Sequence, residues 1–372
     1  MKRPISFLIK PASSLCNLQC KYCFYHSLSD NREKKSYGIM SYDTLENLVK
    51  KALSYDTNSV TFAFQGGEPT LAGLEFFKEF IKLEKKYNSN NIKISHAIQT
   101  NGIIIDENWA RFLHDNNFLV GVSLDGYKEI HDLNRVYDNN KGSFKRVMES
   151  IALFNKFKVE YNILVVVNAI TARHANKIYK FFKKNNFKYL QFIPCLDPLG
   201  EEQGQHNFSL TPKAFGKFLI DLFDNWYKDV MNKDFISIRY FDNLLGMIMG
   251  YPPESCDMNG TCSCQMVVEA DGSVYPCDFY VIDQWKSGAI NENNIDEILS
   301  ADTGKRFIEV SRYVHPKCRQ CQWLRICRGG CRRNREPFVD EKPGLSYFCE
   351  SYDAFFQHSM QKLVNVAKNL NN

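Results

Sequence analysis

The chain has 372 residues, of which 44% are hydrophobic and 14% aromatic, so it can bury a large core and is not disordered. Its formal net charge of +5 comes without clustered runs of Lys and Arg, which argues against a dedicated nucleic-acid-binding protein. The longest apolar run, residues 163–167, is far shorter than the ~20 residues that span a bilayer. The N-terminus also lacks the apolar segment and cleavage site of a secretory signal. We therefore expect a cytoplasmic protein with no membrane span and no nucleic-acid partner.

Strand and helix patterns alternate from the N-terminus to Cys195. Apolar residues at helical spacing, such as Leu45, Leu48 and Val49, follow a predicted cap at Ser41 or Asp43. Six strand–helix units predict a parallel α/β fold, either a partial (β/α)6 barrel or an open doubly wound sheet, and periodicity does not choose between them. The predicted strands are residues 5–10, 60–64, 92–99, 118–124, 161–167 and 189–194.

A cysteine cluster directly follows the first predicted strand and contains Cys16, Cys20 and Cys23. Thiolates are soft ligands for zinc, copper(I) or iron–sulfur clusters, and a chain without an export signal favours metal ligation over disulfides. Three cysteines fill three corners of a four-iron cluster and leave one iron open to a small molecule. The alternative is zinc, with His26 as the fourth ligand.

Glycine-containing turns follow the next three strands. Gln65-Gly66-Gly67-Glu68 follows the second strand, where paired glycines allow the backbone to approach a ligand closely. A plain turn ended by Pro69 is the alternative. Asn101-Gly102 and Asp125-Gly126 follow the third and fourth strands, and each pair alone is an ordinary turn former. Because ligands of parallel α/β folds bind beyond the carboxyl ends of the strands, these turns are candidate ligand contacts.

The spacing Cys-x3-Cys-x2-Cys, with Tyr22 before the last cysteine, resembles the signature of the radical S-adenosylmethionine (SAM) superfamily. The turn after the second strand likewise resembles the GGE motif of that superfamily, and the recurrence of turns at successive strand ends follows its order. The resemblance implies the partial barrel, a [4Fe–4S] cluster whose open iron binds SAM, and a 5′-deoxyadenosyl radical that abstracts hydrogen. It further implies SAM contacts at Tyr22, Gly66, Gly67, Glu68, Ser123, Arg135 and Leu196.

Two neighbours of these motifs, Tyr25 and Gln65, are expected to face the substrate. For Arg135, the alternative to a SAM contact is a solvated or salt-bridged surface residue. The lone Cys195 is interpreted as a buried thiol at a strand end.

Nine of the thirteen cysteines lie from Cys256 onward. Their order, with Gly272 ten residues after Cys262, resembles the SPASM domain, an extension of radical SAM enzymes that modify peptides and proteins. Eight thiolates are enough for two further [4Fe–4S] clusters, whereas zinc ribbons are the alternative for Cys-x2-Cys pairs. Cys264 is left over as an alternative to Cys262. The resemblance assigns Cys256, Cys262, Cys277 and Cys331 to a first auxiliary cluster and Cys318, Cys321, Cys327 and Cys349 to a second.

Residues 267–275 are predicted to form a β-hairpin about the turn Asp271-Gly272. The hairpin delivers Asp278, which the resemblance makes the catalytic base; an exposed turn aspartate is the alternative. Residues 209–250 are predicted as helical connectors whose aromatic face joins two domains. These domains are a radical SAM core at residues 1–235 and a SPASM domain with short helices and a C-terminal helix at residues 236–372.

The whole chain, including Cys277-Asp278-Phe279-Tyr280, resembles the anaerobic sulfatase-maturating enzymes, which convert a cysteine or serine of a sulfatase to Cα-formylglycine. The resemblance implies SAM and three [4Fe–4S] clusters as cofactors. The radical would remove a Cβ hydrogen, Asp278 would take a proton, and the auxiliary clusters would remove an electron. It also implies an unfolded or nascent sulfatase polypeptide as substrate, a flavodoxin- or ferredoxin-like reductant, and a monomer.

The sequence leaves two alternatives to this reaction open. A related SPASM maturase would form a thioether or crosslink in a ribosomal peptide. A non-enzymatic protein would be a zinc-stabilised protein-binding module.

Overall fold

The computed structural model describes residues 3–370 and divides into two compact units. The first unit contains the residues up to 123, residues 135–161 and residues 263–307. The second contains residues 124–134, residues 162–262 and the residues from 308 onward. Both units therefore combine distant stretches of the chain. The division into domains at residue 235 stays a prediction.

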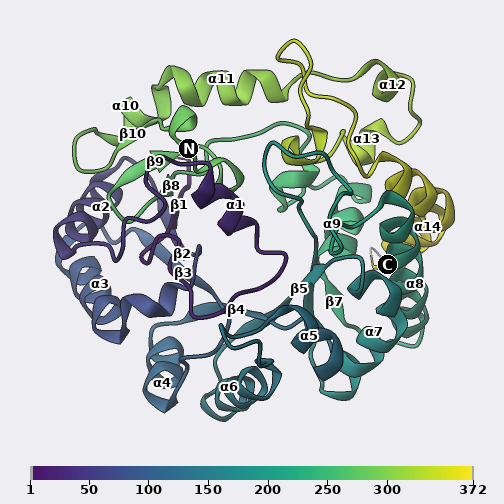
Figure 1. Cartoon of the computed structure of the whole chain (residues 1–372), viewed down its shortest axis with the longest axis horizontal. Coiled ribbons are helices and arrows are strands. Elements are labelled where there is room, and N and C mark those ends of the chain that lie inside the picture. The colour runs from purple at the N-terminus through teal and green to yellow at the C-terminus, as the bar shows by residue number, and fades with distance from the viewer. Residues whose placement is uncertain (1–2, 371–372) are drawn as a thin grey trace. The chain divides into compact units, whose positions relative to one another are not determined.

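In the first unit, parallel strands form a sheet that a hairpin extends at one edge (Figure 1). The registers place Ile5 beside Val60 and Val60 beside Ile94. The hairpin is the predicted one, since its two strands are antiparallel and flank Asp271-Gly272. From the hairpin edge onward, the strands are β10 (Gly288–Ala289), β9 (Ser273–Tyr275), β8 (Val267–Val268), β1 (Ile5–Ile9), β2 (Ser59–Phe64), β3 (Lys93–Thr100) and β4 (Phe118–Ser123).

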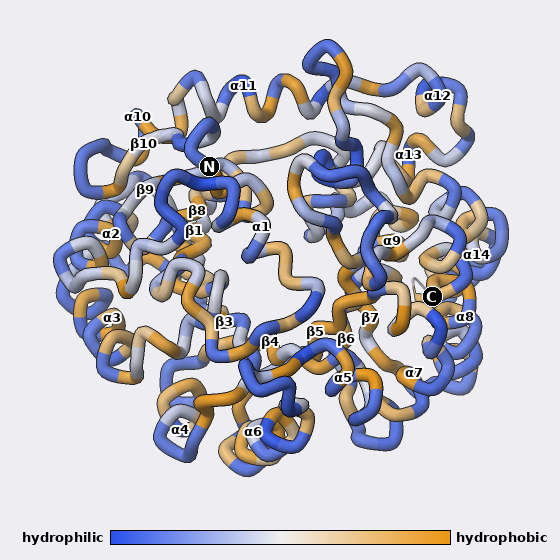
Figure 2. The backbone as a smooth tube through the Cα atoms, viewed as in Figure 1, coloured by the Kyte–Doolittle hydropathy of each residue, from blue (hydrophilic) through white to orange (hydrophobic). Residues whose placement is uncertain are grey.

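Amphipathic helices of the first unit bury aromatic residues against this sheet. Ser41 caps one of them, because its Oγ accepts a hydrogen bond of 3.1 Å from the Thr44 amide. Phe64 packs edge to face on Phe77 and Phe80, with ring centroids 4.9 and 5.0 Å apart. Figure 2 shows apolar and polar residues mixed along these helices. They are α1 (Phe24–Asp30), α2 (Tyr42–Ser54), α3 (Leu74–Tyr87), α4 (Glu107–Asp115), α6 (Phe144–Phe157), α10 (Ile295–Ser300) and most of α11 (Asp302–Ser311).

The second unit contains a parallel sheet of three strands and a long helical pair. Ser351 Oγ donates to the Pro212 carbonyl at 2.6 Å, and Phe355 lies 5.7 Å from Phe223 and 5.8 Å from Phe241 between ring centroids. The predicted aromatic face therefore packs on the C-terminal helix. The elements are β5 (Tyr161–Val167), β6 (Tyr189–Pro194), β7 (Ser237–Ile238), α5 (Lys128–Asn134), α7 (Ala175–Lys184), α8 (Pro212–Met231), α9 (Arg239–Ile248), α12 (Pro316–Arg319), α13 (Leu324–Cys327) and α14 (Cys349–Leu370).

The predicted parallel α/β fold is confirmed, and each of its six strands ends within one residue of the predicted bounds. A partial barrel stays open, and in neither unit do the described strands close into a barrel. Of the helices in residues 3–370, none combines the length and the apolar character needed to cross a membrane.

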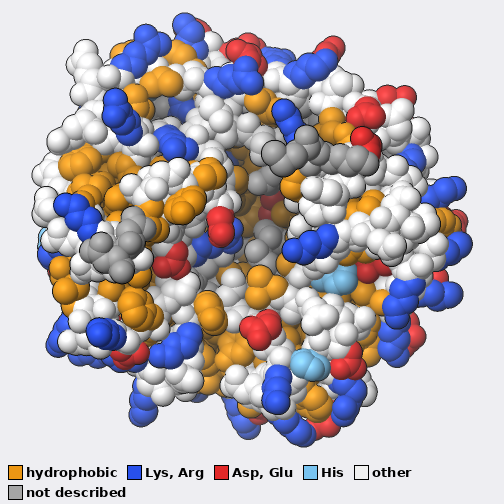
Figure 3. Space-filling model, turned by 180° about the vertical axis from the view of Figure 1, so that it is seen from behind, with side chains coloured by type: hydrophobic (Ala, Val, Ile, Leu, Met, Phe, Trp, Pro, Cys, Tyr) orange, Lys and Arg blue, Asp and Glu red, His pale blue; other side chains and the backbone are white. Residues whose placement is uncertain are grey.

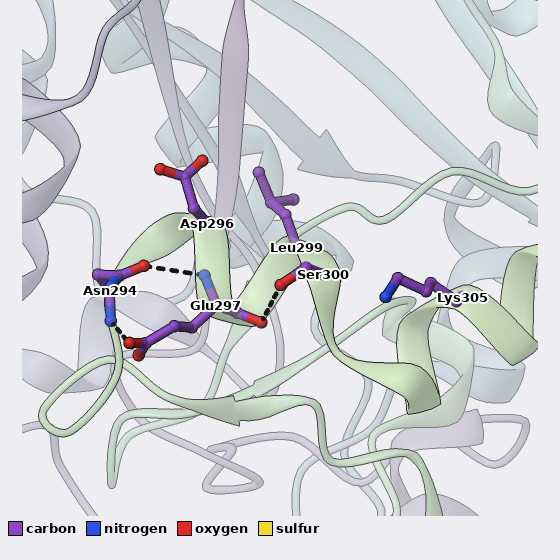
Figure 4. A pocket seen from close by; sticks show the side chains of 6 residues that line it. All are labelled: Asn294, Asp296, Glu297, Leu299, Ser300 and Lys305. Atoms are coloured by element: carbon purple, nitrogen blue, oxygen red, sulfur yellow. Dashed lines mark hydrogen bonds between the residues drawn. The ribbon is translucent and has the colours of Figure 1, made fainter.

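The face of the molecule in Figure 3 shows Lys and Arg side chains interspersed with acidic and uncharged ones. A surface hollow lies beside α10, and Figure 4 shows its lining. Asn294 and Glu297 form a capping box there: Asn294 Oδ1 accepts from the Glu297 amide at 2.8 Å, and Glu297 Oε2 accepts from the Asn294 amide at 3.0 Å. Since no cysteine lines this hollow, the candidate site lies elsewhere.

Candidate active site

The cysteine loop lies beyond the carboxyl end of β1. Backbone hydrogen bonds from Gln19 to Val136 and from Cys23 to Cys20 hold its path. Although Cys16 keeps exposed surface, the protein packed around its thiol raises the pKa to about 11 by desolvation, and the charges of Glu68 and Cys23 add to that rise. Asn101 Nδ2 points at Cys16 Sγ from 3.7 Å. The loop thus offers three thiols as ligands, and the Asn101 amide donates to one of the sulfurs. This donor set fits a four-iron cluster in which one iron has no protein ligand.

The GGE turn follows β2 and needs glycine at both positions. Gly66 and Gly67 have φ angles of +107° and +53°, values that side chains rarely adopt. A Cβ on Gly67 would lie 2.3 Å from the Leu15 carbonyl oxygen, and one on Gly66 would lie 2.4 Å from Lys10 Nζ. The turn therefore fits closely against the cysteine loop and the end of β1.

Glu68 locks the GGE turn from inside the protein. Its carboxylate is 1% exposed and accepts hydrogen bonds from Thr70 and Thr100 hydroxyls at 2.7 Å and from the Asn101 amide at 2.7 Å. Burial raises its pKa, while these hydrogen bonds oppose the rise. Because the carboxylate is fully engaged within the protein, Glu68 fixes the backbone of the turn. Its contact with a cofactor stays a prediction.

The other predicted SAM contacts fall into both units. Arg135 is buried in the first unit, with Nη1 4.0 Å from Cys20 Sγ and its guanidinium 5.5 Å from the Tyr22 ring, so it is not a solvated surface residue. Ser123 is the last residue of β4 in the same unit. Leu196 belongs to the second unit. The role of each in SAM binding stays a prediction.

The hairpin carries Asp278 to the end of β1. Val267 and Val268 of β8 pair with Leu8 and Ile9, and the Lys10 amide donates to the Val268 carbonyl at 2.8 Å. The short helical turn Asp278–Tyr280 follows the hairpin. Pairing of β8 with β1 at the edge of the sheet thus brings Asp278, which lies far along the sequence, to the N-terminal motifs.

Both carboxylate oxygens of Asp278, which is 4% exposed, accept hydrogen bonds. Lys10 Nζ donates to Oδ1 at 2.8 Å. Tyr25 Oη and Gln65 Nε2 donate to Oδ2 at 2.6 and 2.9 Å. Burial and the charge of Asp278 raise the pKa of Tyr25 well above its ordinary value, so the phenol stays protonated and donates. Asp278 is therefore not an exposed turn aspartate, and the two residues predicted beside the substrate both contact it.

Sequence reasoning missed Lys10. Its side chain is 3% exposed, and Nζ lies 4.0 Å from the centroid of the Tyr25 ring as well as on Asp278. The available signal was a lysine placed directly after an apolar strand and before the cysteine loop. Nothing in that pattern named Asp278 as its partner.

A group of four thiols gathers in the second unit. Burial, together with the nearby charges of Cys349, Cys318 and Cys321, raises the pKa of Cys327 to about 11. Trp323 Nε1 donates to Asp353 Oδ1 at 2.8 Å and ties the loop of Cys321 to α14, which begins at Cys349. The four cysteines assigned to the second auxiliary cluster therefore lie within electrostatic reach of one another.

Three of the four cysteines assigned to the first auxiliary cluster also lie close together in the second unit. Burial raises the pKa of Cys331, and the charges of Asp257, Cys256 and Cys262 add to it. Cys277 belongs to the first unit, and its place as fourth ligand stays a prediction.

Burial raises the pKa of Cys264, and a hydrogen bond with the Met266 backbone opposes that rise. Among residues 3–370, no group of three or more His, Cys, Asp and Glu side chains converges as ligands of one metal ion do. Ligands of a single ion converge on one point, whereas a four-iron cluster takes one thiolate at each iron.

Comparisons with known proteins agree with the predicted family. Residues 11–182 match the Radical SAM superfamily, and residues 256–322 match the iron–sulfur cluster-binding SPASM domain. The sequence is 55% identical over 367 residues, 99% of either chain, to a cysteine-type anaerobic sulfatase-maturating enzyme of Clostridium perfringens. It is 34% identical to a serine-type enzyme of Bacteroides thetaiotaomicron, covering 100% of this chain and 93% of that protein.

A solved structure, native anSMEcpe with bound AdoMet and Cp18Cys peptide, superimposes with a TM-score of 0.96 at 53% identity, covering 99% of this chain and 100% of that one. Both matched domains imply [4Fe–4S] clusters, and the first implies SAM. The chain therefore belongs to the family of anaerobic sulfatase-maturating enzymes within the radical SAM superfamily.

Proposed function

We propose that this chain oxidises a cysteine of a sulfatase polypeptide to Cα-formylglycine. The observation that carries the proposal is the buried Asp278 carboxylate, held by Lys10, Tyr25 and Gln65 beside the cysteine loop and the GGE turn. The higher identity to the cysteine-type relative, 55% against 34% for the serine-type one, favours cysteine as the residue modified.

Cys16, Cys20 and Cys23 would hold the cluster that binds SAM, and Tyr22, Gly66, Gly67, Ser123, Arg135 and Leu196 would hold SAM itself. When bound, this pair supplies the 5′-deoxyadenosyl radical that removes one hydrogen atom from the substrate Cβ. A solved relative contains both AdoMet and a peptide named Cp18Cys, which supports a peptide segment as the substrate.

Asp278 then accepts the proton of the substrate thiol. Loss of a Cβ hydrogen atom, a thiol proton and one electron converts –CH2–SH to the thioaldehyde –CH=S, and water replaces sulfur to give the aldehyde and hydrogen sulfide. Lys10 stabilises the carboxylate as the anion that a base must be, and Tyr25 and Gln65 orient its second oxygen. A positioned base of this kind contributes roughly 10²–10⁴ in rate.

Two auxiliary [4Fe–4S] clusters, when bound, would supply the acceptor for this electron. Cys256, Cys262, Cys277 and Cys331 would bind one, and Cys318, Cys321, Cys327 and Cys349 the other, which brings the number of clusters to three. With four protein thiolates on each, neither auxiliary cluster binds substrate directly. The protein would act as a cytoplasmic monomer on an unfolded or nascent sulfatase, with a flavodoxin- or ferredoxin-like donor.

The test uses the full chain, reconstituted anaerobically and reduced, with SAM and a synthetic sulfatase-motif peptide of about 20 residues. We expect 5′-deoxyadenosine and a peptide that has exchanged one sulfur and two hydrogens for one oxygen, and that reacts with a hydrazine. The matched control is the same peptide with serine in place of cysteine, which should react more slowly. A product that lost only hydrogen would indicate a thioether or crosslink instead, and absence of SAM cleavage would overturn the proposal.

A further inference from the structure

Arg335 ends the short helical turn Arg332–Arg335 that begins directly after Cys331. It is 4% exposed, and its guanidinium donates to three backbone carbonyls: those of Ser311 at 3.2 Å, Gly344 at 3.3 Å, and Tyr313. The side chain is therefore fixed by three hydrogen bonds in the interior of the second unit.

No carboxylate in residues 3–370 forms a salt bridge with Arg335. Its neighbour Arg333, by contrast, has Glu336 at 3.2 Å. A buried guanidinium stays charged, and a buried charge without a counter-charge is costly. Burial lowers the pKa of Arg335, and the charge of Arg332 adds to that fall, whereas the charges of Cys318, Cys262 and Cys331 oppose it.

These three cysteines fall in two different ligand sets. Ser311 links Arg335 to the first, because its hydroxyl accepts from the Cys262 amide at 2.8 Å while its carbonyl accepts from Arg335. Tyr313 links Arg335 to the second, since it lies just before the turn in which the Cys318 amide donates to the His315 carbonyl. One fixed cation thus stands within reach of thiolates from both sets.

We propose that Arg335 is a positioning residue for electron transfer, whose single buried charge raises the reduction potentials of both auxiliary clusters together. The proposal rests on the proposed ligand assignment. Reduction adds negative charge to a thiolate-bound cluster, and a cation in a poorly solvated interior stabilises the reduced form. Because one charge acts on both clusters, it shifts both potentials in the same direction and changes the difference between them less than a cation beside only one cluster would.

The test is a redox titration followed by electron paramagnetic resonance. The background is the full chain with Cys16, Cys20 and Cys23 replaced by alanine, so that only auxiliary clusters contribute to the signal. Arg335→Gln should lower both potentials by an amount that changes the oxidised-to-reduced ratio about tenfold at fixed potential, which is ~59 mV for a one-electron couple. Arg335→Lys keeps the charge and should keep both potentials near those of the background protein.

Arg312→Gln is the matched control, because it removes the same formal charge one residue from Ser311 but from a side chain that is 61% exposed and paired with Glu309. It should leave both potentials unchanged. If Arg335→Gln shifts neither cluster or only one, the proposal is wrong.

If Arg335→Gln does not load with iron, Arg335→Lys provides the test instead. Reduction potentials that fall in Arg335→Lys, although its positive charge is retained, would contradict the proposal. A background protein with fewer than about eight irons would instead overturn the ligand assignment itself.

Discussion

Lys10 in the first unit and Arg335 in the second are buried to a similar degree, 3% and 4% exposed, but their charges are balanced differently. Lys10 has a protein carboxylate, Asp278, at 2.8 Å. Arg335 donates hydrogen bonds to backbone carbonyls, and the negative charges that act on it come from three cysteines when these are ionised. The first cation is neutralised by the polypeptide alone, and the second only when cysteines are ionised. In the proposed function, the acid–base centre is thus set up by folding, whereas the electron-transfer centre would be completed by its metal.

Asp278→Asn should produce the largest effect in the first unit. The amide keeps the size of the side chain but takes no proton from the substrate, so aldehyde formation should fall roughly 10²–10⁴-fold while SAM cleavage persists. Quantifying 5′-deoxyadenosine and peptide aldehyde in the same reaction measures both. Asp283→Asn, an exposed aspartate in the same segment, is the control. Normal aldehyde formation by Asp278→Asn would remove this residue as the base.

Lys10→Met should destabilise the protein by ~3–5 kcal/mol, because it leaves a buried carboxylate without its cation. Denaturant unfolding measures this loss. Lys78→Met, which breaks an exposed pair with Glu75, should cost about 1 kcal/mol or less. A loss as small as that of Lys78→Met would show that the buried ion pair of Lys10 does not stabilise the fold.

Removal of iron should discriminate between the two cations. Chelation leaves neutral thiols around Arg335, so the apo-protein should lose protection from hydrogen exchange in residues 308–370 more than in residues 3–123. Arg335→Met removes the uncompensated charge and should restore about 1–3 kcal/mol to the apo-protein. Equal loss of hydrogen-exchange protection in residues 308–370 and 3–123 would contradict the idea that thiolates balance the charge of Arg335. So would an apo-protein whose free energy of unfolding is not raised by Arg335→Met.

The partly buried pair of His96 with Glu84 can lose its charge and should give the smallest effect. His96 Nε2 lies 3.0 Å from both carboxylate oxygens of Glu84. Burial lowers the pKa of His96, but the hydrogen bond and charge of Glu84 outweigh it and leave the pKa raised; burial also raises the pKa of Glu84. The folded state therefore binds more protons than the unfolded state.

Stability from this pair should thus be fully present below about pH 6.5 and fall, by ~1 kcal/mol or less, as pH rises through the raised pKa of His96. Urea unfolding across neutral pH measures the slope. His96→Gln should flatten it, and an unchanged slope would assign the pH dependence to other groups.

The amino-acid sequence by itself determined the local elements and the family. Strand ends, the Ser41 cap and the hairpin about Asp271-Gly272 were predictable because they follow from side-chain periodicity and turn chemistry, which act over a few residues. The spacings of the cysteine loop and of the SPASM cysteines were likewise readable without coordinates, and they were sufficient to predict the family.

Only the tertiary structure decided which distant residues meet. Lys10 and Asp278 are separated by 268 positions, and they meet because β8 pairs with the free edge of β1. Arg335 reads as one of several basic residues after Cys331 until the fold buries it without a salt-bridge partner among residues 3–370. Pairing of strands and burial of charge depend on long-range packing, which no local pattern of residues encodes.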